Sequence, residues 1–380
     1  MRGKKTAGLF ALVFGAVSCL SGCIPHTELD QQAIVEAIGI DYENGEYTAT
    51  LQYFGMEESG GTTLVDNTKP NVITVSGKGA TPSDAVEEAS SRCGKPPMMG
   101  IAGVLVVGKS AAEKGLEGLM GFALAHYESN MKMLVAVAED KAEDVMKLKF
   151  KEGTASVEKL ESMLNNQAFL GLGYSPKFYQ VMDKLRQPTK SAALPLLRVV
   201  DNNSDFTEDG KTAEIAGGAL FREGKYIGKL SIKDMSGLQF LMDRCDTAQL
   251  TVELDDGDVT VVLYEVKTEI NPHYEEGRLK IGVKVTADGK YISSTLSDPI
   301  GAKEEVERLC EESIVKRISG AIEKAFVQGG ADPADLKYSI SSKEYFSWLR
   351  IEENYGEQLK NAEYSVSADV NITRFGISGA

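Results

Sequence analysis

The sequence has few of the residues from which enzyme sites are usually built. It contains only three histidines, His26, His126 and His273, and none of them lies in a pattern typical of a catalytic triad. The G-x-S-x-G motif of hydrolases and the H-E-x-x-H motif of metalloproteases are both absent. We therefore predict a protein that is not an enzyme, and we assign no catalytic, cofactor-binding or metal-binding residue.

Cysteines are also scarce. Beyond the N-terminal region the chain has only Cys93, Cys245 and Cys310, which lie far apart and form no C-x-x-C pair. Three thiols cannot all pair, so a disulfide framework is excluded, although a single bridge stays open. The favoured interpretation is three buried, small apolar side chains.

Long apolar runs are missing except at the N-terminus. Residues 1–5 carry three basic side chains and no acid, and residues 8–20 are almost wholly apolar or small. That run has the length of a secretory signal and is too short to span a bilayer as a helix. It ends in Leu20-Ser21-Gly22-Cys23, the pattern that precedes cleavage and acylation in bacterial lipoproteins.

We therefore predict a signal peptide at residues 1–22, cleavage between Gly22 and Cys23, and lipidation of Cys23. The alternative is an ordinary signal peptide with a chance cysteine near its end. Acyl chains contribute about 0.8 kcal/mol per buried CH₂, so two or three of them hold a protein firmly on a membrane. The expected location is the extracytoplasmic face of the cell membrane.

The mature chain is expected to be strongly acidic. Removing residues 1–22 takes away three of the 41 basic residues and leaves 38 against 56 acidic ones, a net charge of −18. Such a chain is repelled by nucleic acid, and it gains nothing from anionic lipid head groups. The acyl anchor would therefore have to provide the membrane attachment.

Residues 103–110 match the phosphate-loop pattern G-x-x-x-x-G-K-S. In a phosphate loop the four central residues curve so that their N–H groups converge on a phosphate. Here those residues are Val104, Leu105, Val106 and Val107, which prefer an extended strand. A strand-to-helix step is thus expected in place of an ATPase site.

Two acidic runs also have simple interpretations. Asp255-Asp256-Gly257-Asp258 lacks the spacing and the later glutamate of an EF-hand, and predicts a solvated hairpin turn. The glutamates of residues 304–312 alternate with basic residues, which is typical of a solvated helix face with i,i+4 pairs.

The first half of the chain is predicted to mix strands and helices without a regular βαβ repeat. Asn44-Gly45 supplies the turn of a hairpin formed by residues 33–40 and 47–54, and Thr81-Pro82 begins a helix. Residues 57–71 are expected to be an exposed loop. The remaining elements expected are strands at 72–75, 104–107 and 131–137 and helices at 82–91, 110–127, 156–166 and 176–185.

A polar connector at residues 201–212 is the predicted domain boundary. It separates an N-terminal α+β region, 23–200, from a C-terminal α+β domain, 213–380. The C-terminal domain is expected to hold a hairpin around Glu223-Gly224, a long amphipathic helix within 299–328 and a closing strand at 362–375. Its further expected elements are a helix at 233–244, strands at 249–254, 259–270 and 278–286, and a partly helical stretch at 345–349.

Tight turns between consecutive strands indicate antiparallel pairing. The expected fold class is therefore α+β and multi-domain, with antiparallel or mixed sheets and helices packed on one face.

The run from Ile215 to Leu230, IAGGALFREGKYIGKL, followed by Ser236-Gly237-Leu238, resembles the Ger(x)C family, the C-subunit lipoproteins of spore germinant receptors. Gly39-Ile40-Asp41 is similar to the family's early Gly-Ile-Asp, and Trp348 precedes a closing strand as in that family. The chain departs from the family at Ile24, where a tryptophan is common, and at Ile101, where a histidine is frequent. Gly217, Gly218, Gly224 and Gly228 are interpreted as turns and close backbone approaches, although a surface that meets a partner is the functional alternative.

The resemblance implies a lipid-anchored, non-catalytic subunit of a nutrient germinant receptor, in complex with two integral-membrane subunits of the A and B types in the inner spore membrane. No cofactor is implied, and direct binding of a small molecule stays open. The main alternative is a solute-binding lipoprotein of an ABC-type importer, which needs two α/β lobes around a ligand cleft.

Overall fold

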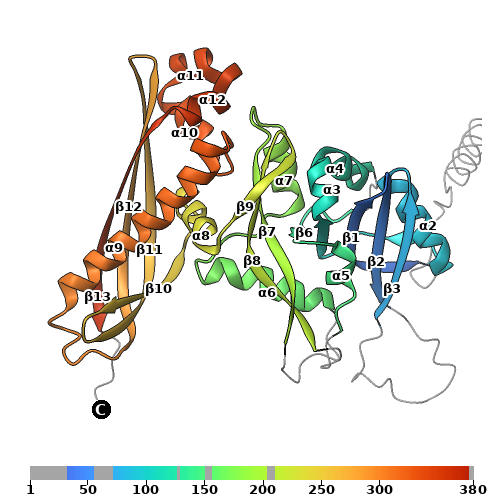
Figure 1. Ribbon diagram of the computed structural model, residues 1–380, viewed down its shortest axis with the longest axis horizontal. Helices are drawn as coiled ribbons and strands as arrows, with labels where there is room; N and C mark the ends of the chain where they lie inside the picture. Colours follow the sequence, from blue (N-terminus) through green and yellow to red (C-terminus); the bar gives the residue numbers. More distant parts are fainter. Residues whose placement is uncertain (1–31, 55–71, 126–128, 150–155, 203–209, 376–380) are drawn as a thin grey trace, which may run out of the picture. The chain divides into compact units, whose positions relative to one another are not determined.

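A computed structural model describes residues 32–54, 72–125, 129–149, 156–202 and 210–375 (Figure 1). From Ala33 onwards the chain forms one compact unit. The described residues contain two mixed sheets, one of nine strands and one of four. The fold is thus α+β and multi-domain, as the sequence predicts.

The larger sheet has the strand order β3-β2-β1-β5-β6-β7-β8-β9, with the short β4 paired beside β1. Its strands are β1 (Ala33–Glu43), β2 (Glu46–Phe54), β3 (Val72–Gly79), β4 (Pro97–Met98), β5 (Val104–Gly108), β6 (Leu134–Ala138), β7 (Ala192–Asp201), β8 (Lys211–Arg222) and β9 (Lys225–Leu230).

Two hairpins of this sheet form where the turn residues predict them. Asn44 and Gly45 both adopt positive φ angles, 54° and 89°, between β1 and β2. Glu223 and Gly224 do the same between β8 and β9, at 52° and 72°. Positive φ at both central residues gives the turn whose twist matches that of paired strands.

The centre of the sheet is parallel, which corrects the expectation of no βαβ repeat. Strands β1, β5, β6 and β7 run parallel to one another. Every residue of β5 and β6 is buried, because parallel strands are covered on both faces and need not alternate. The connecting helices are α3 (Lys109–Lys114), α4 (Leu116–Ala125), α5 (Ala142–Met146), α6 (Ser156–Phe169) and α7 (Phe178–Leu185).

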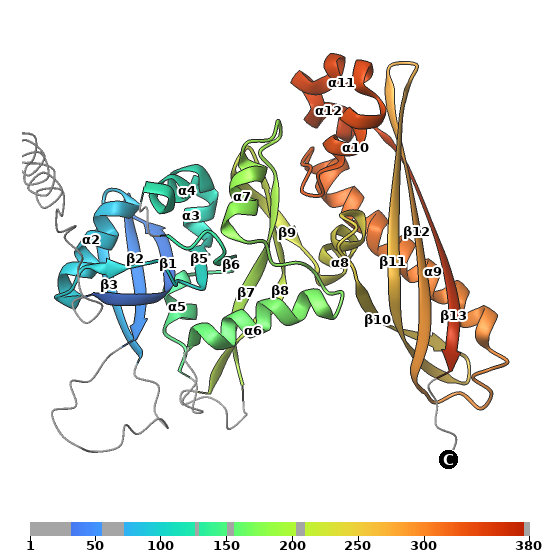
Figure 2. The same cartoon turned by 180° about the vertical axis from the view of Figure 1, so that it is seen from behind.

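Helices cover both faces of this sheet (Figures 1 and 2). Leu105 and Val107 pack in the same core as α3, α4, α7 and α2 (Pro82–Cys93), whereas Val104 and Val106 pack with α5 and α6. The helix predicted at 110–127 is divided into α3 and α4, because Gly115 adopts a φ of 129°. Its last residues, and the loop expected at 57–71, lie outside the described residues.

The nine-stranded sheet continues across the predicted connector. Strand β7 ends at Asp201 and β8 begins at Lys211, both within residues 201–212, and the two strands pair antiparallel from Ala192↔Phe221 to Asp201↔Lys211. The division into regions 23–200 and 213–380 stays a prediction, but the two regions share this sheet.

The smaller sheet has the order β10-β11-β12-β13, and its apolar face packs against α9 (Lys303–Ala321). Val306, Cys310, Ile314 and Ile318 of α9 are all buried, as their helical spacing predicts. Here one helical face covers one side of the sheet. The other elements are α8 (Ile232–Leu241), β10 (Thr247–Leu254), β11 (Gly257–Glu275), β12 (Arg278–Ser294), the π-helix η2 (Ile322–Gln328), α10 (Leu336–Lys343), α11 (Tyr345–Ile351), the short 3₁₀ turn η3 (Glu352–Asn354), α12 (Tyr355–Lys360) and β13 (Glu363–Phe375).

Strand β13 forms one edge of the smaller sheet and runs parallel to β12. Two of its backbone N–H groups are occupied by α9: Val370 donates to Glu311 Oε1 at 3.1 Å and Ile372 donates to Glu307 Oε1 at 2.7 Å. These glutamates, which the sequence places on a solvated helix face, therefore bind the edge of the sheet.

Candidate functional site

The predicted lipidation residue Cys23 and its neighbour Gly22 lie outside the described residues, as do His26 and His126. Their assignment stays a prediction. Within the described ranges, no helix is both long and apolar enough to cross a membrane.

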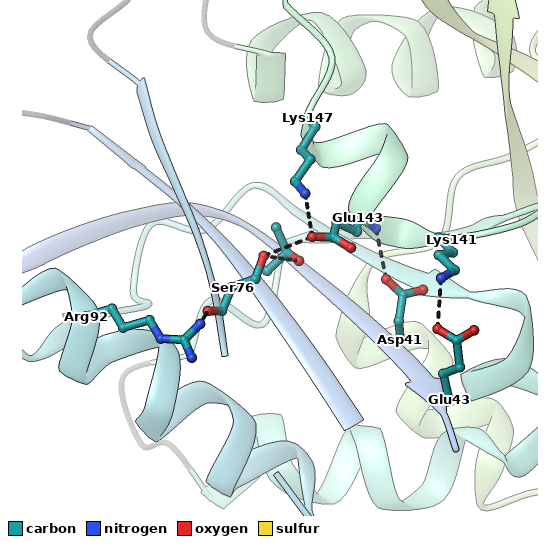
Figure 3. Close-up of polar contacts among 8 residues, drawn as sticks. Asp41, Glu43, Ser76, Arg92, Lys141, Glu143 and Lys147 are labelled. Carbon is teal, nitrogen blue, oxygen red and sulfur yellow. Dashed lines mark hydrogen bonds and ion pairs between the residues drawn. The ribbon is translucent and has the colours of Figure 1, made fainter. Parts of the chain in front are cut away.

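The Gly-Ile-Asp run at residues 39–41 builds a polar cluster around Asp41 (Figure 3). Asp41, on β1, accepts hydrogen bonds from the backbone N–H groups of Ala142 at 2.8 Å and Glu143 at 2.9 Å. The first N–H groups of an α-helix have no partner within the helix. The N-cap residue of α5 makes no side-chain capping hydrogen bond to them. Asp41 therefore acts as the N-terminal cap of α5 from a distant part of the chain.

Two glycines make room for this arrangement. A Cβ at Gly108 would stand 1.8 Å from Asp41 Oδ1, and a Cβ at Gly39 would stand 2.8 Å from Met146 Cγ. Real Cβ atoms essentially never make contacts this short, so a side chain at either position would displace Asp41 or Met146.

Charged pairs surround Asp41 at the surface. Glu43 binds Lys141 at 2.8 Å, and Glu143 binds Lys147 at 2.6 Å and accepts from Ser76 Oγ at 3.3 Å. Burial raises the pKa of the Asp41 carboxyl, and the two backbone hydrogen bonds offset this only in part. The cluster holds α5 against β1 and β3.

The phosphate-loop match is a strand and a helix start, as the side chains predict. Residues 104–108 form the buried strand β5, so their N–H groups serve the sheet ladder instead of a phosphate. Lys109 is exposed at the start of the six-residue helix α3. The second glycine of the pattern, Gly108, leaves the space that the Asp41 carboxylate occupies.

The run Asp255-Asp256-Gly257-Asp258 forms the tight turn between β10 and β11, where Leu254 pairs with Gly257. Asp256 accepts a hydrogen bond from Ser297 Oγ at 2.9 Å. Across the part of the chain that the structure describes, no group of three or more His, Cys, Asp or Glu side chains could hold a metal ion.

Cys93, Cys245 and Cys310 are free thiols. Cys245 and Cys310 are buried, as predicted, and Cys93 is half-buried. Burial raises the pKa of the Cys245 and Cys310 thiols to about 12, so neither is a reactive thiolate.

Three of the four glycines in the family-like run have structural roles. A Cβ at Gly217 would stand 2.1 Å from the Leu230 carbonyl oxygen, and one at Gly218 would stand 2.2 Å from Met235 Sδ. Gly224 occupies the hairpin turn with a φ of 72°. Gly228 differs: no atom lies within 4 Å of its Cβ position.

Polar contacts that the sequence does not reveal join the nine-stranded sheet to the helical segment before β13. Lys184 of α7, with 4% of its side chain exposed, donates to the Pro333 carbonyl at 2.6 Å and binds Asp335 at 2.8 Å. Arg222 at the end of β8 donates to the Gly329 carbonyl at 3.1 Å. These contacts connect α7 and β8 to the segment between η2 and α10.

Comparison with known proteins places both halves of the chain in one family. Residues 25–199 match the spore germination protein N-terminal domain, and residues 216–376 match the spore germination B3/GerAC-like C-terminal domain. The chain is 24% identical to spore germination protein KC of Bacillus subtilis (strain 168), over 97% of this chain and 96% of that protein. It is 21% identical to spore germination protein GerQC of Bacillus cereus, over 80% of this chain and 82% of that protein.

The fold also matches a solved structure. The crystal structure of the GerBC protein superposes with a TM-score of 0.58 and 16% sequence identity, covering 88% of this chain and 96% of that one. A match at this identity shows a shared fold. Together with the two domain matches, which span most of the sequence, it establishes that the chain belongs to the GerAC family of spore germination proteins.

Proposed function

We propose that this chain is a lipid-anchored, non-catalytic subunit of a nutrient germinant receptor, held on the extracytoplasmic face of the inner spore membrane through Cys23. The observation that carries the proposal is the pair of family matches over residues 25–199 and 216–376, which begins directly after the lipidation motif. The acyl chains supply the membrane attachment, and the two sheets supply a folded body in water.

A binding role agrees with the described chemistry. His273 is exposed, and its Nδ1 lies 3.6 Å from Glu344 Oε1. The Asp41 cluster is structural, and the buried thiols are protonated at neutral pH. In the proposed complex the partners are the integral-membrane A- and B-type subunits, and this chain offers surfaces to them.

The family matches and the curated relatives all carry spore germination names, which speaks against the solute-binding lipoprotein of an importer. The structure adds a physical reason. The four-stranded sheet has one antiparallel run of three strands and a single helical layer, unlike the second α/β lobe that a ligand cleft requires.

Metabolic labelling with a tagged fatty acid tests the anchor. The wild-type chain should carry the label, lose residues 1–22 and stay with the membranes after a high-salt wash. Cys23→Ala should lose the label and move to the soluble fraction with its fold intact, whereas the matched variant Cys93→Ala should behave as wild type. Retention of Cys23→Ala on washed membranes would contradict the proposed anchor.

Germination assays test the role. Spores that lack this chain should lose their response to one class of nutrient, and the wild-type gene should restore it. A Cys23→Ala gene should restore it poorly, because the unanchored chain is diluted away from membrane partners. Full rescue by the unanchored chain would show that the tether is dispensable.

A further inference from the structure

Gly228 is a glycine that the fold of this chain does not require. It lies within β9, has no positive φ angle, and leaves open space where a Cβ would stand. Glycine in a strand interior costs stability, and it commonly marks a place where another backbone or a ligand approaches closely. Gly228 therefore leaves room for another backbone to lie against β9.

Gly228 opens onto a groove between β9 and the π-helix η2. The groove has a volume of about 440 Å³. Ile227 and Leu230 of β9 form one wall with Gly228, and Lys324, Gln328 and Gly329 form the other. Ile227, which is 45% exposed, is an extra residue at a β-bulge and has no partner on β8. A bulge redirects a side chain, and π-helical turns are frequent at functional sites.

Strand β9 is an edge of the nine-stranded sheet and, within the described ranges, pairs with β8 alone. The opposite edge, β3, is bound by α2: Lys78 N–H donates to Glu88, and Arg92 donates to the Ser76 carbonyl. In the other sheet, β13 is bound by Glu307 and Glu311. An open edge strand is a template for an added strand. Among the residues that the structure describes, side chains bind the backbone of the β3 and β13 edges, whereas β9, like β10, pairs with one strand only.

The groove is basic although the chain is acidic. Arg222, Lys229 and Lys324 line it and no Asp or Glu does, in a sequence with 56 acidic and 41 basic residues. Each cation already has a partner. Arg222 donates to the Gly329 carbonyl and lies 3.7 Å from Glu223 and 3.6 Å from Glu357, Lys229 binds Glu139 at 2.7 Å, and Lys324 binds Asp234 at 2.5 Å. Their side chains remain 25%, 40% and 43% exposed, which leaves N–H groups for a further acceptor.

We propose that this groove binds an extended, acidic segment of a partner protein, which adds as a strand to the outer edge of β9. Backbone hydrogen bonds to β9 would provide affinity, and carboxylates opposite Arg222, Lys229 and Lys324 would provide selectivity. Gly228 allows the incoming backbone to lie close to the sheet. The proposal goes beyond the anchored-subunit role and stands whether or not Cys23 is acylated.

A peptide-binding assay tests the chemistry. The probe is a fluorescent peptide of alternating threonine and glutamate, the control probe has glutamine at each glutamate, and both are titrated onto the full chain in detergent. The acidic peptide should bind about tenfold more tightly than the glutamine peptide, a difference that raised salt should reduce. Equal affinities for the two peptides would overturn the proposal.

Two variants locate the binding. Gly228→Leu fills the groove and should weaken acidic-peptide binding about tenfold, whereas Gly282→Leu should not. Gly282 is a matched control because it is a strand glycine of the other sheet with no atom closer than 3.6 Å to its Cβ position. If Gly228→Leu unfolds, Lys229→Gln, at an exposed position, should still weaken binding severalfold; unchanged binding in a folded variant would refute the site.

Photo-cross-linking in spores identifies the occupant. A benzophenone amino acid at Ile227 should cross-link to a segment rich in Asp and Glu from another protein, and Gly228→Leu should abolish the product. The same residue at Ile292, which is 44% exposed in the other sheet, is the control. Cross-linking to a second copy of this chain, to a segment without acids, or to nothing would contradict the proposal. Cys23→Ala should leave peptide binding unchanged, which separates failure of the groove from failure of the anchor.

Discussion

Asp41 and Gly108 lie on neighbouring parallel strands, and the carboxylate of the first occupies the space where the second would carry a side chain. The carboxylate reaches past Gly108 to the free N–H groups of α5. The glycine that completes the phosphate-loop pattern is thus explained by a helix cap within the protein.

This relationship gives the first prediction. Gly108→Ala should lower the free energy of unfolding by about 1–3 kcal/mol, because Asp41 must move and leave a buried N–H group without a partner. Lys109→Ala, at the exposed neighbouring position, should change it by less than about 0.5 kcal/mol. Urea unfolding of both variants measures the difference, and equal effects would contradict the role assigned to Gly108.

The buried ion pair at the junction gives the second prediction. Lys184→Met should cost about 2–3 kcal/mol, because the Pro333 carbonyl loses its Lys184 donor and the Asp335 carboxylate keeps only the hydrogen bond from Gln187. The matched variant Lys190→Met breaks an exposed pair with Glu117 and should cost less than about 1 kcal/mol. Chemical denaturation of the two variants compares them; a Lys184→Met protein as stable as wild type would show that the junction is held by other contacts.

Thiol reactivity gives the third prediction. In a mature chain carrying Cys23→Ser, iodoacetamide at about pH 8 should modify Cys93 and spare Cys245 and Cys310, because only thiolates react and burial raises the pKa of these two thiols to about 12. All three should react in denaturant. Mass spectrometry of the labelled peptides measures this, and rapid native labelling of Cys245 would show that its surroundings open.

The start of α8 gives a prediction on pH. Burial of Asp234 opposes ionisation, but hydrogen bonds from Lys324 and Ser231 outweigh it and lower the pKa of the Asp234 carboxyl. A lowered folded-state pKa adds stability that is present above the unfolded value near 4 and is lost as the pH falls through the folded pKa.

Asp234→Asn should therefore be less stable than wild type at neutral pH, and the gap should narrow below about pH 4. Urea unfolding of both proteins over a pH series measures the gap. A gap that stays constant into the acid range would show that the charge of Asp234 does not contribute to stability.

The sequence predicts those elements whose cause is local. Asn44-Gly45 and Glu223-Gly224 form hairpins because their own φ angles decide the turn, and the spacing from Val306 to Ile318 decides the buried face of α9. The parallel centre of the large sheet was not predictable in this way. A wholly apolar strand such as β5 has no alternation to show which neighbours it has, or in which direction they run.

Contacts between residues far apart in the sequence could not be predicted from the sequence either. Asp41 caps a helix 101 residues away, and Lys184 binds Asp335 across 151 residues. Both depend on the assembled fold, and a single sequence carries only an indirect sign of them. For Asp41 that sign was the Gly-Ile-Asp run, which marks the residue without showing what it binds.

The pairing of β7 with β8 bears on how family members can be recombined. A chimaera joined within residues 203–209 would combine β7 from one parent with β8 from the other. The side chains at ten paired positions would then come from two proteins that did not evolve together. Exchanges that keep Ala192–Asp201 and Lys211–Arg222 from a single parent preserve that register, so that a change in the behaviour of the chimaera can be assigned to one half and not to a misaligned sheet.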